Sequence, residues 1–169
     1  MFPSPAPLLA LLLLFVSPLL AQPPKGTITT PTANTAIQPG ANFSFAYHPL
    51  ADYGVSTYAV HVWLLDVSGV PHNASAVTPL GISAVSGHYF GRFDYANYPA
   101  VPYPKNPLPS VLTMPDFSVA PGGFGSGEHA SNLPLQLTVI EEFGGFAPSI
   151  GNNLSIAATT IIYNATSTK

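Results

Sequence analysis

Seven Asp and Glu residues are spread over the 169 positions of this chain, and they suggest glycoside hydrolysis as the first chemistry to test. A glycosidase needs two carboxyl groups that face each other across the scissile bond. Glu141 and Glu142 cannot form this pair by themselves, because neighbouring residues on a strand point to opposite faces. Asp94, Asp116 and Glu141 could supply a pair only through the fold. We expect instead that Glu142 is solvated and that Glu141 lies at a strand end near Phe143.

Five histidines raise the question of a metal site. They are His48, His61, His72, His88 and His129. No two are spaced i, i+2 for a strand or i, i+4 for a helix, so a site would have to be assembled from separate loops, with Glu128 and His129 as the one close pair of ligands. The chain has no cysteine, which excludes zinc–thiolate sites, thiol nucleophiles and disulfides. We expect no metal and no cofactor.

Motifs for nucleophilic catalysis and phosphate binding are also missing from the sequence. Ser126 comes closest to the centre of a G-x-S-x-G elbow, but Phe124 and Glu128 stand where the motif requires glycine. The glycine-rich stretch 122–127 lacks the Gly-Lys-Ser/Thr of a phosphate-binding loop. We therefore predict a flexible loop here, no catalytic residues, and a protein that is not an enzyme.

A tyrosine-rich segment is the best candidate for ligand binding. Aromatic residues gather beside prolines between His88 and Tyr103, and the proline-rich stretch 98–109 is predicted to run as an extended loop. Exposed tyrosine rings can stack on sugar rings, while charged side chains orient hydroxyl groups. The candidate ligand-binding residues are Arg92, Asp94, Tyr95, Tyr98 and Tyr103. The alternative is that these aromatic side chains fold back and cover a face of a sheet.

The amino end has the layout of a signal peptide. An apolar run from Leu8 to Val16 precedes Ala21 and the polar Gln22, and the run is too short to cross a bilayer. We expect residues 1–21 to be removed and residues 22–169 to form a single domain. The carboxyl end has no hydrophobic tail that would direct a lipid anchor, so we expect a secreted, extracellular product.

Charged side chains are scarce, at 7% of the residues, with four Lys and Arg against seven Asp and Glu. The chain has no basic stripe for phosphates, which argues against nucleic acid as a partner. Glycans could hydrate a surface with so little charge. Four N-x-S/T sequons would accept them, at Asn42, Asn73, Asn153 and Asn164.

Twenty prolines and fourteen glycines divide the chain into short segments whose apolar residues alternate, which predicts an all-β protein. The expected strands cover 26–30, 42–47, 57–67, parts of 81–93 with bends at Gly87 and Gly91, 110–114, 135–141 and 154–163. The strand at 57–67 should be the longest and central, because both of its faces are apolar. The strand at 42–47 should bury its three aromatic residues. The last two strands should form an antiparallel hairpin.

About seven strands of this kind predict a two-sheet antiparallel sandwich of immunoglobulin-like or fibronectin-like type. Trp63 is expected near its centre as the bulky core residue. Long loops rich in proline at 98–109 and in glycine at 121–127 should connect the strands. The first strand, which ends at Pro31, is the expected edge.

The opening of the expected domain, from Ile28 to Phe45, resembles that of small secreted proteins of unknown function from mushroom-forming fungi. The resemblance extends through 58–66 and 121–125 into the last two strands. The same opening is distantly similar to the immunoglobulin-like domain of fungal cell-wall proteins of the Kre9/Knh type. These resemblances imply an extracellular or cell-wall setting and a sandwich fold, and they imply no catalytic residues.

Three functions remain open from the sequence. The leading one is a secreted non-enzymatic glycoprotein that binds, or is part of, an extracellular matrix or wall, with polysaccharide or cell-wall components as partners. The second is a carbohydrate-binding module that uses the tyrosine-rich loop. The third is a glycoside hydrolase built on the carboxylates named above. The sequence identifies no protein partner.

Overall fold

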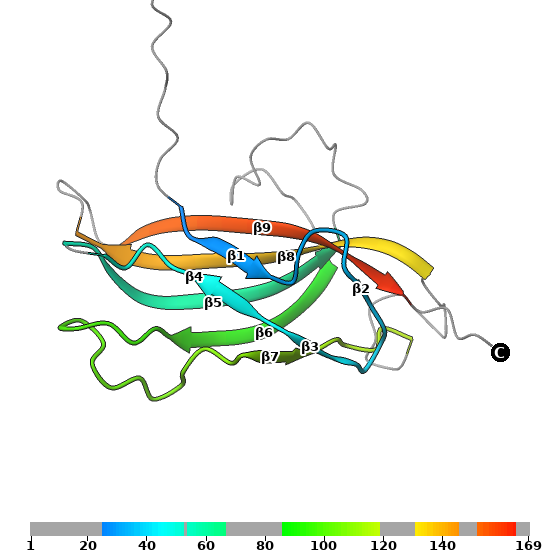
Figure 1. Ribbon diagram of the computed structural model, residues 1–169, viewed down its shortest axis with the longest axis horizontal. Helices are drawn as coiled ribbons and strands as arrows, with labels where there is room; N and C mark the ends of the chain where they lie inside the picture. Colours follow the sequence, from blue (N-terminus) through cyan, green and yellow to red (C-terminus); the bar gives the residue numbers. More distant parts are fainter. Residues whose placement is uncertain (1–24, 53, 67–85, 119–130, 146–151, 165–169) are drawn as a thin grey trace, which may run out of the picture.

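The computed structural model shows an all-β protein (Figure 1). It describes residues 25–52, 54–66, 86–118, 131–145 and 152–164. No helix occurs among these residues, and hence none that could span a membrane. The strands are β1 (Thr27–Thr30), β2 (Ala36–Ile37), β3 (Asn42–Ser44), β4 (Ala46–His48), β5 (Ser56–Asp66), β6 (Ser86–Asp94), β7 (Val111–Thr113), β8 (Ser131–Gly144) and β9 (Asn153–Asn164). The predictions for His72, Asn73, Glu128, His129 and the glycine-rich loop fall outside the described residues.

One layer of the fold is a five-stranded sheet in the order β2-β9-β8-β5-β6. Its pairs are antiparallel except for β2 and β9, which run parallel over two residue pairs. The predicted hairpin of the last two strands is confirmed by the pairing of β8 with β9. The predicted central place of β5 is confirmed too, but the prediction that it is the longest strand is wrong, since β8 has 14 residues and β5 has 11.

The second layer consists of two separate two-stranded sheets rather than the single sheet that the sequence suggested. The strand expected over 42–47 is divided at Phe45: β3 pairs with β7, and β4 pairs with β1. The three aromatic residues of this stretch are buried as predicted, because the alternation of side chains continues through the division. A single run of sequence therefore contributes to two sheets.

The hydrophobic core lies between the two layers, which overlap in Figure 1. On β5 it takes the even-numbered residues Val60, Val62 and Leu64, all fully buried. The prediction that Trp63 occupies the core is therefore wrong, because strand alternation turns it to the opposite, outer face of the sheet. The largest fully buried side chain is instead that of Tyr163 on β9.

A bulge in β6 decides which of its residues reach the outer face. Trp63 pairs with Tyr89 and Val62 pairs with Gly91, so Phe90 is the extra residue. Gly91 has a φ of 140°, which confirms the bend predicted there. Because of this bulge Tyr89 and Arg92 lie on the same face although they are three residues apart.

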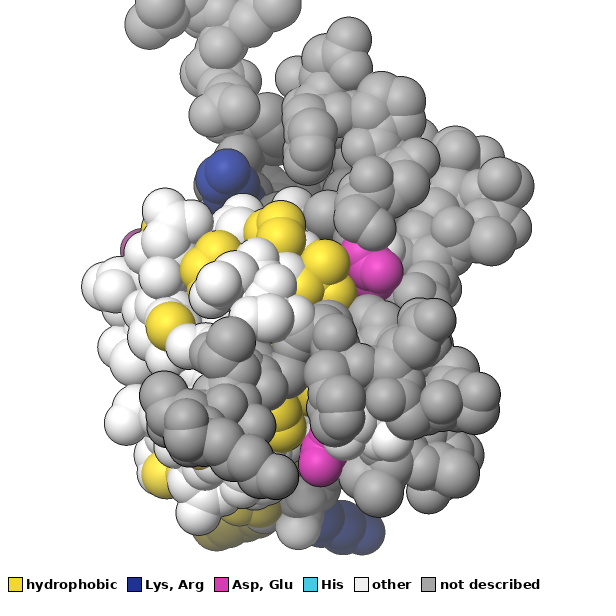
Figure 2. Space-filling model, turned by 90° about the vertical axis from the view of Figure 1, so that its right-hand side faces the viewer, with side chains coloured by type: hydrophobic (Ala, Val, Ile, Leu, Met, Phe, Trp, Pro, Cys, Tyr) yellow, Lys and Arg dark blue, Asp and Glu magenta, His cyan; other side chains and the backbone are white. Residues whose placement is uncertain are grey.

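The surface carries little charge. On the face that Figure 2 shows, charged side chains lie far apart, and hydrophobic side chains are scattered among backbone atoms and other uncharged side chains. This agrees with the charged fraction of 7% over the whole chain. Two exposed aromatic residues stand out elsewhere, Tyr98 at 87% and Tyr103 at 88% exposure, so neither folds back onto a sheet.

Candidate functional site

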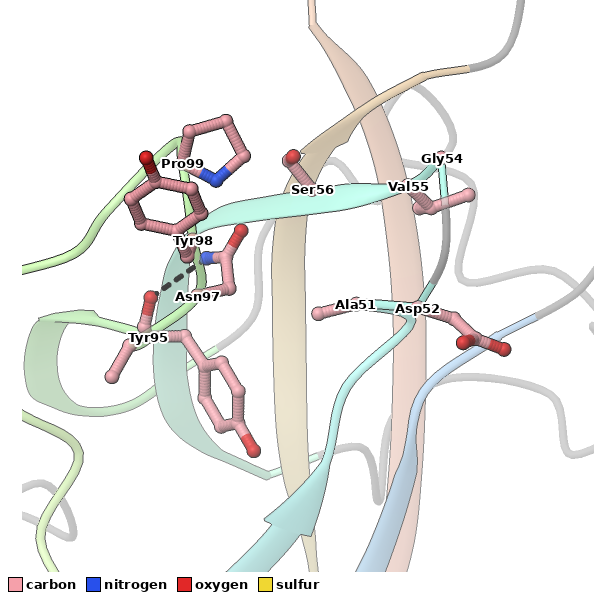
Figure 3. Close-up of a pocket in the computed structure, with 10 residues that line it drawn as sticks. Ala51, Asp52, Gly54, Val55, Ser56, Tyr95, Asn97, Tyr98 and Pro99 are labelled. Atoms are coloured by element: carbon pink, nitrogen blue, oxygen red, sulfur yellow. Dashed lines mark hydrogen bonds between the residues drawn. The ribbon is translucent and has the colours of Figure 1, made fainter.

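A hollow of about 610 Å³ lies where the chain enters β5 and where it leaves β6 (Figure 3). One wall is formed by residues 51–52 and 54–56, and the other by residues 95–99. Figure 3 shows Tyr95, Asn97 and Tyr98 on one side and Ala51, Asp52 and Val55 on the other. Two of the five predicted ligand-binding residues, Tyr95 and Tyr98, thus line one hollow, whereas Arg92, Asp94 and Tyr103 are not among its lining residues.

A tight turn presents Tyr98 to solvent at the edge of the hollow. Its base is closed by two backbone hydrogen bonds between Asn97 and Val101, of 3.0 and 2.7 Å. The Asn97 amide donates to the carbonyl oxygens of Tyr95, at 2.9 Å, and Thr57. The stretch 98–109 is therefore not uniformly extended as predicted, because this turn bends it. Among the described residues the buried Asn97 Oδ1 has no hydrogen-bond partner, which leaves an acceptor beside the hollow.

Asp94 and Arg92 hold the tyrosine-rich loop in place. Asp94 Oδ2 accepts hydrogen bonds from the backbone amides of Lys105, at 2.9 Å, and Asn106, at 3.1 Å. Its Oδ1 accepts one from Arg92 at 3.2 Å. The Asn106 and Lys105 amides, together with Arg92, lower the pKa of the Asp94 carboxyl group. Both charged side chains thus position the loop that carries Tyr98 and Tyr103.

We expect Asp94→Ala to release this loop while the core stays folded. The backbone amides of Lys105 and Asn106 should exchange with deuterium much faster, because they lose their acceptor. Since the pKa of Asp94 is lowered in the folded state, its contribution is complete above the ordinary value of 3.8 and is lost only as the pH falls below it. Amide exchange followed by mass spectrometry tests both statements. Asp116→Ala is the control, and equal exchange in the two variants would contradict the role of Asp94.

The opposite wall of the hollow depends on Glu141. The sequence predicts this residue at a strand end near Phe143; it is instead fully buried within β8, which continues to Gly144. Its carboxyl group accepts hydrogen bonds from the Tyr47 hydroxyl at 2.6 Å, the Leu50 amide at 2.9 Å and the Thr57 hydroxyl. Burial and the Glu141 carboxylate raise the pKa of Tyr47. Because Leu50 and Thr57 flank the segment 51–56, Glu141 anchors both ends of this wall.

Two of the carboxylates proposed for hydrolysis, Asp94 and Glu141, lie on opposite faces of the sheet. Asp94 pairs with Ala59 on the outer face, whereas Glu141 pairs with Val60 on the core face. Glu142 does share the outer face with Asp94, but Arg92 contacts both carboxylates, at 3.2 and 4.0 Å. Asp116 accepts hydrogen bonds from the neighbouring Ser118, after β7.

Sequence reasoning missed a group of three hydrogen-bonded side chains, those of Tyr89, His61 and Glu142, on the outer face of the sheet. His61 Nε2 lies 2.6 Å from Glu142 Oε1, and His61 Nδ1 lies 2.9 Å from the Tyr89 hydroxyl. Trp63 packs against Tyr89 with 4.3 Å between ring centroids. The alternation of β5 had placed His61 and Trp63 on one face, but only the strand order could show that β6 and β8 flank them.

The other two described histidines, His48 and His88, are not part of this hydrogen-bonded group. His88 packs edge-on against Phe90, and burial lowers its pKa. His48 Nδ1 lies 3.1 Å from the carbonyl oxygen of Pro49. The described part of the chain contains no group of three His, Asp or Glu side chains that could hold a metal ion.

The asparagines of three of the four sequons lie on described strands. Asn42 is exposed on β3, and its Oδ1 accepts a hydrogen bond from Thr113 at 2.7 Å. In Asn153 the Nδ2 atom, to which a glycan would be attached, is buried and has no hydrogen-bond partner among the described residues. Asn164 is half-buried at the end of β9. A glycan on Asn42 suits the folded domain, whereas Asn153 could accept one only before β9 pairs with β8.

The comparisons with known proteins give no further assignment of this site. No family model, no curated protein and no solved structure matches the chain.

Proposed function

We propose that this protein is a secreted, non-enzymatic glycoprotein that binds polysaccharide of an extracellular matrix or cell wall. The observation that carries the proposal is the hollow bordered by Tyr95 and Tyr98. Tyr98 is 87% exposed at its edge, where a sugar ring can stack on it. The Ser56 hydroxyl, which lines the hollow, supplies a polar group for sugar hydroxyls.

The way the walls are held supports binding rather than chemistry. Glu141 and Asp94 both hold backbone amides next to the two walls, and Asp52 lines the hollow itself. A preformed site of this kind reduces the ordering that a ligand must impose. The scarcity of charge and the exposed Asn42 fit a glycosylated extracellular domain.

The test is retention of the purified protein on insoluble chitin, β-glucan and cellulose. We expect the protein to be depleted from solution by at least one of them. Tyr98→Ala should weaken that binding roughly tenfold, which corresponds to about 1.4 kcal/mol. Tyr103→Ala is the matched control, because Tyr103 is equally exposed on the same loop but does not line the hollow.

Two outcomes would contradict the proposal. If none of the three polymers retains the protein, a structural or protein-binding role replaces it. If Tyr98→Ala and Tyr103→Ala bind as the unsubstituted protein does, the hollow is not the binding site.

We also propose that the two layers belong to a sandwich of immunoglobulin-like or fibronectin-like type, as in the cell-wall proteins that the amino end resembles. The antiparallel pairing of β8 and β9 and the core between the layers support this assignment. A crystal structure that traces the connection between β5 and β6 would test it, because a connection incompatible with those topologies would rule it out.

A further inference from the structure

The hydrogen-bonded group of Tyr89, His61 and Glu142 comes from three neighbouring strands, β6, β5 and β8. The side chains of His61 and Glu142 are about one quarter exposed, at 25% and 24%, and Tyr89 is 41% exposed. All three residues are thus within reach of a molecule from solution. None of them lines the hollow described above, so this cluster is a separate site.

The hydrogen bonds determine the direction in which protons are donated. A carboxylate only accepts hydrogen bonds, so the Nε2 atom of His61 carries the proton that is shared with Glu142. A neutral imidazole has a single N–H group, which leaves Nδ1 as an acceptor. In this neutral form the Tyr89 hydroxyl donates a hydrogen bond to Nδ1 across 2.9 Å. Hydroxyl, imidazole and carboxylate stand in the order of a nucleophile, its general base and the group that orients the base.

Neighbouring side chains hold this arrangement in position. Trp63 packs against the Tyr89 ring at 4.3 Å between centroids, with 30° between the ring planes. The His61 ring lies 6.2 Å from the Tyr89 ring and is nearly parallel to it, at 20°. Arg92 Nε lies 4.0 Å from Glu142 Oε1, on the side of the sheet away from the core. The orientation of the hydroxyl group toward the imidazole is thus fixed before any ligand arrives.

We propose that Tyr89 is a nucleophile that accepts an acyl group from an ester donor with an apolar acyl part. The phenolic oxygen attacks the carbonyl carbon while its proton passes to His61 Nδ1. The bond from that carbon to the leaving oxygen then breaks, and the proton passes from His61 to the departing alcohol. The products are an O-acyl tyrosine and a free alcohol. Trp63, packed against the Tyr89 ring, supplies an apolar surface for the acyl part.

An aryl sulfonyl fluoride reports the same nucleophile, because the phenolic oxygen bonds to sulfur, fluoride leaves, and the proton passes through His61 to water. We would treat the purified protein with 4-toluenesulfonyl fluoride and measure the rate of labelling at each tyrosine by peptide mass spectrometry. Exposure alone predicts the fastest reaction at Tyr98 and Tyr103, which are about twice as exposed as Tyr89. We expect Tyr89 to react at least about tenfold faster than either, as a general base would provide.

Two substitutions test whether His61 is the cause of the fast labelling expected at Tyr89. His61→Gln keeps a polar side chain but removes the base, so Tyr89 should then react no faster than Tyr103. Tyr89→Phe keeps the ring against Trp63 and should remove the label from that peptide. The comparison among tyrosines within the unsubstituted protein needs no variant to fold. Labelling that follows exposure, or an unchanged rate at Tyr89 in His61→Gln, would overturn the proposal.

Discussion

Replacing Glu141 by Ala should lower the free energy of unfolding by about 3–5 kcal/mol, a typical cost of breaking a buried polar network. The substitution leaves the Tyr47 hydroxyl, the Leu50 amide and the Thr57 hydroxyl without their acceptor in a fully buried position. Glu141→Gln should cost about 2 kcal/mol, because its amide group places a donor against one of these donors. Urea unfolding at neutral pH measures both values.

Glu142→Gln is the matched control for this prediction. It makes the same chemical change one residue away, at a side chain that is 24% exposed and bonded to His61. Its cost should stay below about 1 kcal/mol, as for a surface ion pair. Equal destabilisation by the two Gln variants would contradict the role assigned to Glu141. Since Glu141 also anchors both ends of the segment 51–56, Glu141→Gln should weaken polysaccharide binding as well.

Gly145→Ala should be the second severe substitution, with an expected loss of about 3 kcal/mol in unfolding free energy. Gly145 has a φ of 118°, a conformation that alanine rarely adopts. A Cβ atom there would lie 2.0 Å from the Gly54 carbonyl oxygen and 2.9 Å from Val55 Cα. Both are backbone atoms of the wall of the hollow, so they cannot move aside without distorting that wall.

Gly40→Ala separates the effect of this contact from that of backbone conformation alone. Gly40 also has a positive φ, of 70°, but an added Cβ would meet no atom within 4 Å. Its substitution should cost about 1 kcal/mol, which is the strain of the left-handed region by itself. Thermal unfolding and polysaccharide retention should both be affected more by Gly145→Ala. Similar values for the two variants would show that the contact with Gly54 and Val55 is unimportant.

The sequence by itself located most of the strands and separated the two faces of several of them. Alternation along 43–47 predicted which aromatic side chains are buried, and alternation along 57–67 separated Val60 and Val62 from His61 and Trp63. The bend at Gly91 was predicted from residue type, because few other residues adopt its backbone conformation. These features depend on neighbours along the chain, which the sequence displays directly.

Only the tertiary structure decided which face of β5 meets the core, since both faces are apolar enough to be buried. The pairing of strands distant in sequence then placed Trp63 outside, enclosed Glu141 and brought Tyr89, His61 and Glu142 together. A shift of one residue in strand register would send each of these side chains to the other face. The polar contacts of this protein therefore depend on register and strand order, which are properties of the assembled sheet rather than of any one segment.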